Sequence, residues 1–371
     1  MKLTLAVKLA PDAEQAKALL ETLEAFNAAC NYLGEVAFRL KSANKYRLQK
    51  EAYREVRQRF GLSSQMAIRA ISKVCEAYKR DRSIQPTFRP HGAMCYDERI
   101  LSWKSADRVS LLTLRGRVVV PCVFGAYQAG RLDRRQGQAD LVYRDGVFFL
   151  YVTVDVPEAE PFKPQGTLGC DLGVVNILTD SDGIVYTGAL VNGLRHRHRR
   201  LRKKLQAKGT KSSRRLLRKR RQKEARFGRH TNHVIGKQIV AKALDTKRRI
   251  ALEDLRGIRA RIRSRKLQRA TLSSWSFEQL GSFIAYKARR EGVPIVYVDP
   301  GNTSRTCPAC GHVDKANRPS QSRFLCTRCG LAGLPDYFAA VIIGRRGSVS
   351  GPYASDASTL LAAPGANAHV L

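Results

Sequence analysis

Two short sequences near the end of the chain, CPACG at Cys307–Gly311 and CTRCG at Cys326–Gly330, place four cysteines in two CxxC pairs separated by 15 residues. This spacing is typical of a structural zinc site in which four thiolates surround the ion. A glycine follows the second cysteine of each pair, where the knuckle turn favours a residue that can adopt positive φ. Because all four ligands are thiolates, no position is left open for catalysis. We therefore predict a zinc ribbon that stabilises the fold, with the ligands Cys307, Cys310, Cys326 and Cys329.

Three acids flank this predicted ribbon in the chain. Asp171 lies on a predicted strand, Glu253 ends the predicted strand 249–252, and Asp336 opens a short predicted helix. A ribonuclease-H-like nuclease has acids at such positions, and its fold brings them together around two divalent ions. Carboxylates suit Mg²⁺, which takes oxygen ligands. Each acid alone would be unremarkable, but together they predict a split nuclease domain that the ribbon interrupts.

The chain has a strong excess of positive charge. Its 371 residues include 67 Lys and Arg and 31 Asp and Glu, which gives a net charge of +36, and 43% of the residues are hydrophobic. The hydrophobic content indicates folded domains, and a compact protein tolerates such self-repulsion best when a polyanion neutralises it. Nucleic acid is therefore the expected partner. A solvated basic surface of the ribosomal-protein type would also imply RNA, and charge alone says nothing about chemistry.

The N-terminal part of the sequence predicts a β-rich domain with inserted helices. Apolar and polar residues alternate over 3–9, as in a half-buried strand, and a helical pattern follows, with Asp12 and Gln15 as an expected capping box. From 88 to 165 the pattern is again that of strands, with a hairpin that turns at Asp145-Gly146. A small barrel completed by the first strand is the expected result.

A second predicted helix, at about residues 63–80, has an apolar face and a polar stripe. The stripe consists of Gln65, Arg69 and Lys73, whose i, i+4 spacing projects them together. Such a stripe is either a merely solvated face or a surface that contacts a nucleic-acid groove, and the pattern does not separate the two.

Residues 195–229 concentrate the positive charge. They contain 18 Lys and Arg and one acid, Glu224, so this segment contributes 18 − 1 = 17 of the +36. A block of like charge can be a disordered tail, but this one lies between predicted strands of a core, which favours an ordered helical hairpin. Because it has almost no aromatic residues for stacking, we expect it to bind phosphates without reading sequence. Candidate contacts are Arg218, Arg220 and Arg221.

With these motifs in place, the sequence resembles the TnpB family of transposon-encoded RNA-guided DNA nucleases, which are similar to the ancestors of type V CRISPR effectors. The resemblance covers nearly the whole chain, and its specificity lies in the combination of motifs. They are Gly169–Asn176 (GCDLGVVN), Asn232–Val240 (NHVIGKQIV), Leu252–Leu255 (LEDL), Tyr286–Ala288 (YKA), Thr303–Ser304 with Cys307–Gly311, and Asp336–Ala340 (DYFAA).

The resemblance implies an α/β multidomain fold: a split RNase H-like (RuvC) nuclease domain with an inserted zinc ribbon, and an N-terminal wedge-like β-barrel with an inserted helical recognition domain. It implies that Asp171, Glu253 and Asp336 form the RuvC centre. The implied cofactors are structural Zn²⁺ and catalytic Mg²⁺, with two magnesium ions expected. The predicted bounds are 1–10 and 88–165 for the barrel, 11–87 for the helical domain, 166–300 and 334–346 for the nuclease, 301–333 for the ribbon and 347–371 for a flexible tail.

The resemblance also implies the partners. They are a guide RNA from the transposon end and a double-stranded target DNA, whose short flanking motif the protein itself reads. By analogy, Gln65, Arg69 and Lys73 are candidate readers of that motif, since Gln pairs with adenine and Arg or Lys with guanine in the major groove.

One departure from the family follows the last acid. The family often reads Asp-x-Asn-Ala-Ala-x-Asn-Ile, whereas Phe338 and Ile342 occupy both Asn positions here. Neither Asn is a metal ligand, and nuclease-dead relatives lose catalytic acids that this chain keeps. Two alternatives to a guided nuclease stay open: a nuclease-inactive RNA-guided DNA-binding repressor, and an unguided zinc-ribbon nucleic-acid-binding or transposase protein.

The sequence shows no export signal. Its start, MKLTLAVKLA, alternates polar and apolar residues and so lacks the apolar region of a signal peptide, and no apolar run of 18 residues occurs elsewhere. Only four of the nine cysteines have metal spacing, which fits a reducing compartment. We expect a prokaryotic cytoplasmic protein, nucleoid-associated when on DNA, with no membrane contact and no obligate protein partner.

Overall fold

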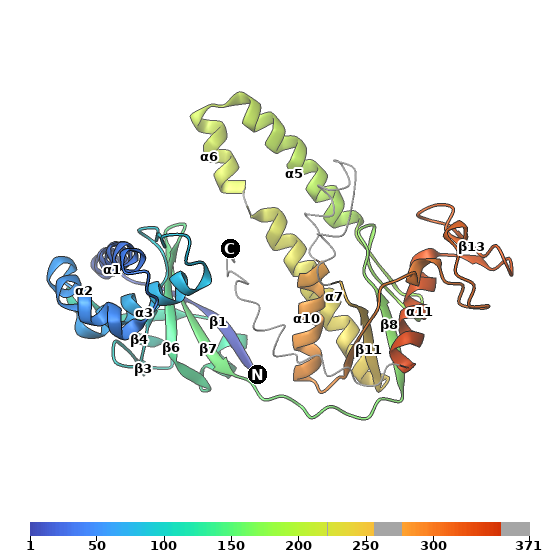
Figure 1. Ribbon diagram of the computed structural model, residues 1–371, viewed down its shortest axis with the longest axis horizontal. Helices are drawn as coiled ribbons and strands as arrows, with labels where there is room; N and C mark the ends of the chain where they lie inside the picture. The colour runs from blue at the N-terminus through green and yellow to red at the C-terminus, as the bar shows by residue number, and fades with distance from the viewer. Residues whose placement is uncertain (221, 256–276, 350–371) are drawn as a thin grey trace. The chain divides into compact units, whose positions relative to one another are not determined.

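The structure is a computed structural model that describes residues 1–220, 222–255 and 277–349 (Figure 1). The chain divides into two compact units, Met1–Pro157 and a second that begins at Glu158, and each has its own hydrophobic core. Within the described ranges, no helix combines the length and apolar character needed to cross a membrane.

The first unit combines one large sheet with helices. Its elements are β1 (Lys2–Leu9), α1 (Ala13–Arg39), α2 (Lys45–Phe60), α3 (Ser64–Arg80), β2 (Met94–Tyr96), β3 (Leu101–Ser105), β4 (Arg108–Thr113), β5 (Gly116–Val123), α4 (Ala126–Leu132), β6 (Arg135–Arg144) and β7 (Val147–Asp155). The seven strands lie in the order β2-β6-β7-β1-β5-β4-β3. The edge strands β2 and β3 do not pair with each other in this part of the chain, so the hydrogen-bonded sheet is open. A wedge-like barrel stays a prediction.

Local signals of the first unit appear where the sequence predicts them. Asp12 Oδ1 accepts a hydrogen bond from the Gln15 amide at 2.8 Å, and the Asp12 amide donates to Gln15 Oε1 at 3.3 Å, which confirms the capping box at the start of α1. Asp145 and Gly146 take φ values of 48° and 86°, so they form the predicted turn between β6 and β7. These two features fix where α1 begins and how the hairpin is registered.

The second unit is an α/β unit with a small ribbon. Its elements are β8 (Gly166–Asp171), β9 (Asn176–Asp180), β10 (Val185–Thr187), α5 (Ala189–Lys208), α6 (Lys211–Arg220), α7 (Lys223–Asp245), β11 (Arg248–Glu253), α10 (Phe277–Arg290), β12 (Ile295–Val298), η1 (Thr303–Arg305), η2 (Lys315–Asn317), β13 (Phe324–Leu325), β14 (Ala332–Gly333) and α11 (Pro335–Val349). Five strands lie in the order β10-β9-β8-β11-β12. β8, β11 and β12 are parallel, and β9 is antiparallel to β8. The predicted α/β class is confirmed.

Helices cover both faces of this sheet. Ile239 of α7 and Ile284 of α10 share a buried cluster with Leu252 of β11. On the other face, Ile343 of α11 packs with Ala251 of β11. The helix α11 therefore lies directly on the strands whose ends carry the predicted acids.

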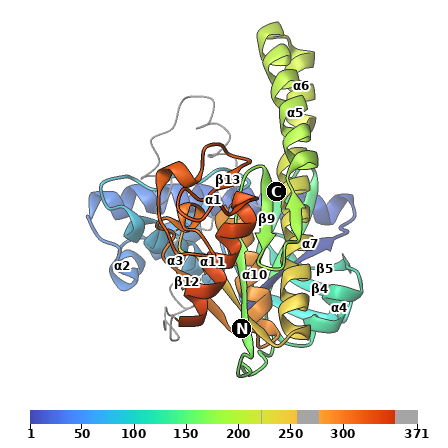
Figure 2. The ribbon, with the colours of Figure 1, turned by 90° about the vertical axis from the view of Figure 1, so that its right-hand side faces the viewer.

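The basic segment 195–229 is helical, as predicted. α5 and α6 form a hairpin that extends from the sheet, and Figure 2 shows it pointing away from the strands. Glu224 of α7, the segment's one acid, lies 3.6 Å from Arg195 Nε and 3.4 Å from Arg202 Nη2, both on α5. The single carboxylate thus joins α5 to α7. It offsets only one of the segment's 18 positive charges.

Candidate functional site

Three elements of the second unit bring the predicted acids to one place. β8 and β11 are parallel neighbours paired up to Cys170 and Leu252, so Asp171 and Glu253 follow next to each other at the same edge of the sheet. Asp336 comes to this edge from the first turn of α11, next to the helix N-terminus. The negative charges of Glu253 and Asp336 both act on Asp171. The structure therefore gathers the three carboxylates that the sequence separates.

A glycine allows this approach. A Cβ atom at Gly169 of β8 would lie 2.0 Å from the carbonyl oxygen of Ala340 and 2.4 Å from the amide nitrogen of Gly344. The backbone of α11 consequently touches the backbone of β8, which no other residue at 169 would permit. This contact fixes the distance between Asp336 on the helix and Asp171 two residues further along the strand.

The acidic cluster has a perturbed protonation equilibrium. Burial, and after it the charges of Glu253 and Asp336, raise the pKa of Asp171 to about 8. Burial also raises the pKa of Glu253, although a hydrogen bond that Thr303 Oγ1 donates to Glu253 Oε1 at 2.6 Å opposes the shift. Carboxylates crowded in this way need a proton or a cation to offset their charge. The donor set fits hard divalent ions such as Mg²⁺.

Two residues beside Asp336 were not predicted as part of the site. Asn176 Nδ2 donates to Asp336 Oδ2 at 2.9 Å, and Arg318 Nη2 lies 3.6 Å from Asp336 Oδ1. Asn176 ends the motif that begins at Gly169, so its position next to the first acid was a usable signal. Arg318 lies in the irregular part of the ribbon, where no periodic pattern points to it.

The four predicted cysteines also meet. Their sulfur atoms all lie within 4.8 Å of one another, with 3.5 Å between the Cys307 and Cys329 sulfurs and 3.6 Å between those of Cys310 and Cys326. Gly311 and Gly330 have φ values of 71° and 73°, the positive values expected at knuckle turns. This geometry and the four thiols fit a tetrahedral zinc site.

The two departures from the family motif are apolar packing residues. Phe338 makes an edge-to-face contact with Phe324 of the ribbon at a centroid distance of 5.1 Å, and Ile342 is buried. Phe338 therefore joins α11 to the ribbon, and neither side chain displaces a predicted acid.

The polar stripe of α3 faces protein groups and is not a solvated face. Arg69 Nε donates to Asp97 Oδ2 at 2.7 Å, and Gln65 hydrogen bonds the same oxygen. Lys73 Nζ donates to Asn27 Oδ1 at 2.9 Å, and burial lowers the pKa of Lys73. The three side chains do project together, but they pack within the first unit. A role in reading DNA stays a prediction.

The predicted phosphate contacts of the basic segment have different surroundings. Arg218 is exposed on α6, and Arg220 is half-buried. Arg221 lies outside the described residues. Their role in binding nucleic acid also stays a prediction.

The sheet, its covering helices and the acidic cluster place the second unit in the class of α/β units that carry acidic residues at one edge of the sheet. Within that class, residues 277–343 match the family model described as "Cas12f1-like, TNB domain". The chain is 39% identical over 121 residues to the CRISPR-associated endodeoxyribonuclease Cas12f1 of Sulfoacidibacillus thermotolerans, covering 32% of this chain and 27% of that protein. It is 32% identical over 130 residues to the TnpB-like protein MJ0751 of Methanocaldococcus jannaschii, and this match covers 35% of this chain and 46% of that protein. The predicted resemblance to the TnpB family is confirmed, because these matches support a TnpB/Cas12f-type family.

Solved structures match the fold over a larger share of the chain than the sequence relatives do. A Cas12f1–sgRNA–target DNA complex matches with a TM-score of 0.60 at 13% identity, covering 93% of this chain and 98% of that one. A mini-RNA-guided endonuclease, CRISPR-Cas_phi3, matches with a TM-score of 0.57 at 10% identity, covering 95% and 93%. In sequence, by contrast, the matches span less than half the length of these two curated relatives.

Proposed function

We propose that the chain is an RNA-guided DNA endonuclease that cuts by metal-dependent phosphodiester hydrolysis. The observation that carries this proposal is the convergence of Asp171, Glu253 and Asp336 at one edge of the second unit's sheet. The relatives support it, because their names describe endodeoxyribonucleases and a complex with guide RNA and target DNA.

In this proposal, the three carboxylates hold Mg²⁺. Two bound ions would supply an activated water and stabilise the leaving oxygen of the phosphodiester. The chain's own residues prepare the site: Thr303 orients Glu253 by its hydrogen bond, and Asn176 orients Asp336. Arg318 places a cation beside the cluster, where it can attract the phosphate of the substrate.

The finer assignments of the fold belong to the same proposal. The strand order β10-β9-β8-β11-β12, with β9 antiparallel to β8, supports an RNase H-like (RuvC) domain. The helices α1 to α3 lie in the chain between β1 and β2 of one sheet, which supports a wedge domain with a helical recognition insertion. A guide from the transposon end and a flanking DNA motif follow from the family resemblance.

The test begins with the protein purified together with RNA from its own locus. Sequencing of the co-purified RNA identifies the guide, and cleavage of a DNA that matches this guide is then measured with Mg²⁺ and with EDTA. Asp171→Asn and Glu253→Gln should abolish cleavage and leave DNA binding nearly intact. The matched control is Glu278→Gln, which neutralises an exposed acid of the same unit. Undiminished cutting by the Asp171 or Glu253 variant, or cutting in EDTA, would refute the proposed centre.

A further inference from the structure

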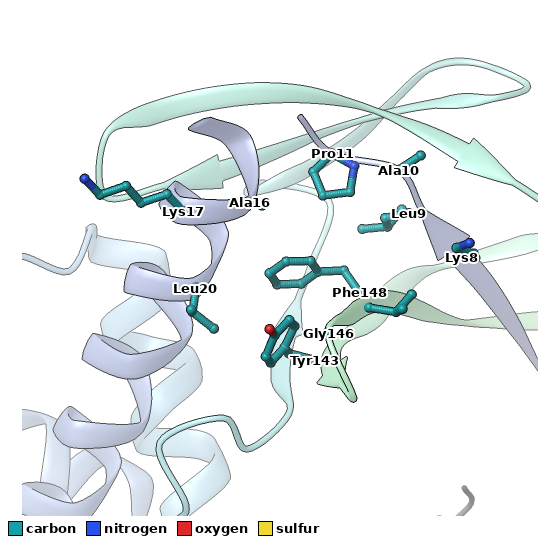
Figure 3. A pocket seen from close by; sticks show the side chains of 11 residues that line it. Lys8, Leu9, Ala10, Pro11, Ala16, Lys17, Leu20, Tyr143, Gly146 and Phe148 are labelled. Carbon is teal, nitrogen blue, oxygen red and sulfur yellow. The ribbon is translucent and has the colours of Figure 1, made fainter. Parts of the chain in front are cut away.

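The first unit has an open hollow of about 460 Å³ where the end of β1, the start of α1 and the β6–β7 hairpin meet (Figure 3). This volume is within the range of ordinary ligand sites. Leu9, Pro11 and Leu20 contribute apolar walls, and the rings of Tyr143 and Phe148 lie between them. The hollow belongs to the first unit alone, so the acidic cluster has no part in it.

The aromatic floor is packed against neighbouring rings. Phe148 is buried, and its ring centroid lies 4.7 Å from that of the half-buried Tyr143. His91 contacts Tyr143 edge-on at a centroid distance of 5.3 Å and is itself held by Glu24, whose Oε1 lies 2.9 Å from His91 Nε2. These neighbours thus fix the Tyr143 ring. Among the described residues no group hydrogen bonds its hydroxyl, which leaves a donor and acceptor at the hollow.

Two cations flank this floor. Lys8 of β1 and Lys17 of α1 are exposed and lie on different sides of the hollow (Figure 3). Within the part of the chain that the structure describes, neither has a carboxylate partner. A ligand that matches the hollow has a flat apolar group that stacks on Tyr143. It also has negative charge that pairs with the ammonium groups of Lys8 and Lys17. The whole first unit has 26 basic and 16 acidic residues, a net charge of +10, which favours a polyanion.

We propose that this hollow binds an unpaired nucleotide of a single-stranded nucleic acid. The base stacks against Tyr143, and the adjoining phosphates lie near Lys8 and Lys17. Aromatic rings beside basic side chains are the usual means of holding single strands, because every base has a face to stack and every nucleotide has a phosphate. The identity of the strand rests on the proposed function, under which it is the guide RNA or unwound DNA, and the two share this chemistry.

The experiment measures binding of fluorescein-labelled hexauridylate and hexathymidylate to the full chain in 0.5 M NaCl, where purely electrostatic contacts are weakened. Tyr143→Leu should weaken binding about 5- to 150-fold, which is the range for the loss of one stacked base. Tyr143→Phe keeps the ring and should stay close to the wild-type affinity. The matched control is Tyr46→Leu, which removes an aromatic ring of α2 that is 82% exposed and lies outside the hollow.

A second readout locates the contact. Hexauridylate containing 4-thiouridine is photo-cross-linked to the full chain, and the peptide containing Tyr143 should be labelled. A larger effect on hexauridylate than on hexathymidylate assigns the site to RNA, and the reverse assigns it to DNA. Equal affinity of Tyr143→Leu and wild type, or competition by an oligoglutamate peptide as strong as that by the oligonucleotide, would overturn the proposal. Because binding is measured, a chain without nuclease activity can still give the expected result.

Discussion

Gly169 helps to position the three clustered acids, although it has no side chain of its own. It lies on β8 two residues before Asp171, and its missing side chain lets α11 rest on the strand. A backbone contact thus helps to set the spacing of the acids, and the residue that permits it has no functional group.

Gly169→Ala should therefore destabilise the protein by about 1 to 3 kcal/mol, because the added methyl overlaps backbone atoms of α11 that have no rotamer to change. Cleavage should fall further than stability alone explains, since Asp336 moves with α11. Thermal melting and guided cleavage are measured on the same preparation. Gly193→Ala is the control: it lies in α5 with nothing within 4 Å of the new Cβ, and should be neutral or stabilising. Wild-type melting and cutting by Gly169→Ala would contradict this account.

We expect His233 to contribute to the pH dependence of the second unit's stability. It stacks on Phe283 at a centroid distance of 3.8 Å, and burial, followed by the charges of Lys287 and Arg229, lowers the pKa of His233 from 6.5 to about 4. The folded state therefore binds fewer protons than the unfolded state between these values. The contribution of neutral His233 to the free energy of unfolding is complete above pH 6.5 and is lost as the pH falls toward 4.

His233→Phe keeps a ring on Phe283 and removes the titration. We expect its melting temperature to fall less than that of the wild type between pH 6.5 and 4. His196→Phe, which replaces an exposed histidine of α5, should follow the wild-type profile. Parallel profiles for wild type and His233→Phe would show that this residue does not set the acid response.

At the scale of elements, α3 is anchored by polar contacts as well as by its apolar face. Lys73→Met keeps the length of the side chain but leaves Asn27 Oδ1 and the Ala93 carbonyl without their donor. We expect a loss of about 1 to 3 kcal/mol in the free energy of unfolding, measured by denaturant titration. A randomised-flank cleavage library should then show an unchanged motif if Lys73 only packs. A shifted motif at wild-type stability would instead identify Lys73 as a reader.

The hairpin of α5 and α6 gives a second prediction at this scale. Neutralising Arg218, Arg220 and Arg221 together should weaken binding to unrelated DNA duplexes equally, because we expect the segment to contact phosphates and not base edges. The slope of log K against log salt should fall by up to ~0.9 for each phosphate that the variant no longer neutralises. Binding isotherms on two duplexes of different sequence at several salt concentrations provide the measurement. A weakening confined to one sequence would contradict a purely positioning role.

Elements with strong local signals could be predicted from the sequence. The meeting of the three acids was predicted only from their places along the chain, and the other long-range side-chain contacts of the site were not predicted. The capping box at Asp12, the turn at Asp145 and the two cysteine pairs each depend on a few neighbouring residues, whose conformational preferences act wherever the chain goes. The polar stripe of α3 was ambiguous because its partner Asp97 is 28 residues from Arg69. The ion pair between Arg318 and Asp336 could not be predicted for the same reason, since only the folded ribbon brings the two side chains together.

At the scale of the whole molecule, we expect the acidic cluster to depend on the ribbon. The ribbon occupies the chain between β12 and α11, and Phe324 and Phe338 pack it against the helix that carries Asp336. Cys326→Ser should therefore lower the zinc content below one ion per chain, lower the melting temperature and reduce cleavage, since a structural zinc site contributes on the order of 10 kcal/mol when occupied. Elemental analysis, melting and cleavage are compared with Cys95→Ser, a thiol without metal spacing. Full activity in zinc-free protein would contradict this coupling.

The same chain order has a consequence for synthesis. A ribosome makes β8 and the basic segment 195–229 well before it reaches Asp336. Every nascent chain that ends before Asp336 therefore lacks at least one of the three acids, whatever it has already folded. Under the proposed function, a growing polypeptide can capture RNA before it is able to cut anything, so the order of translation itself keeps an unfinished nuclease harmless.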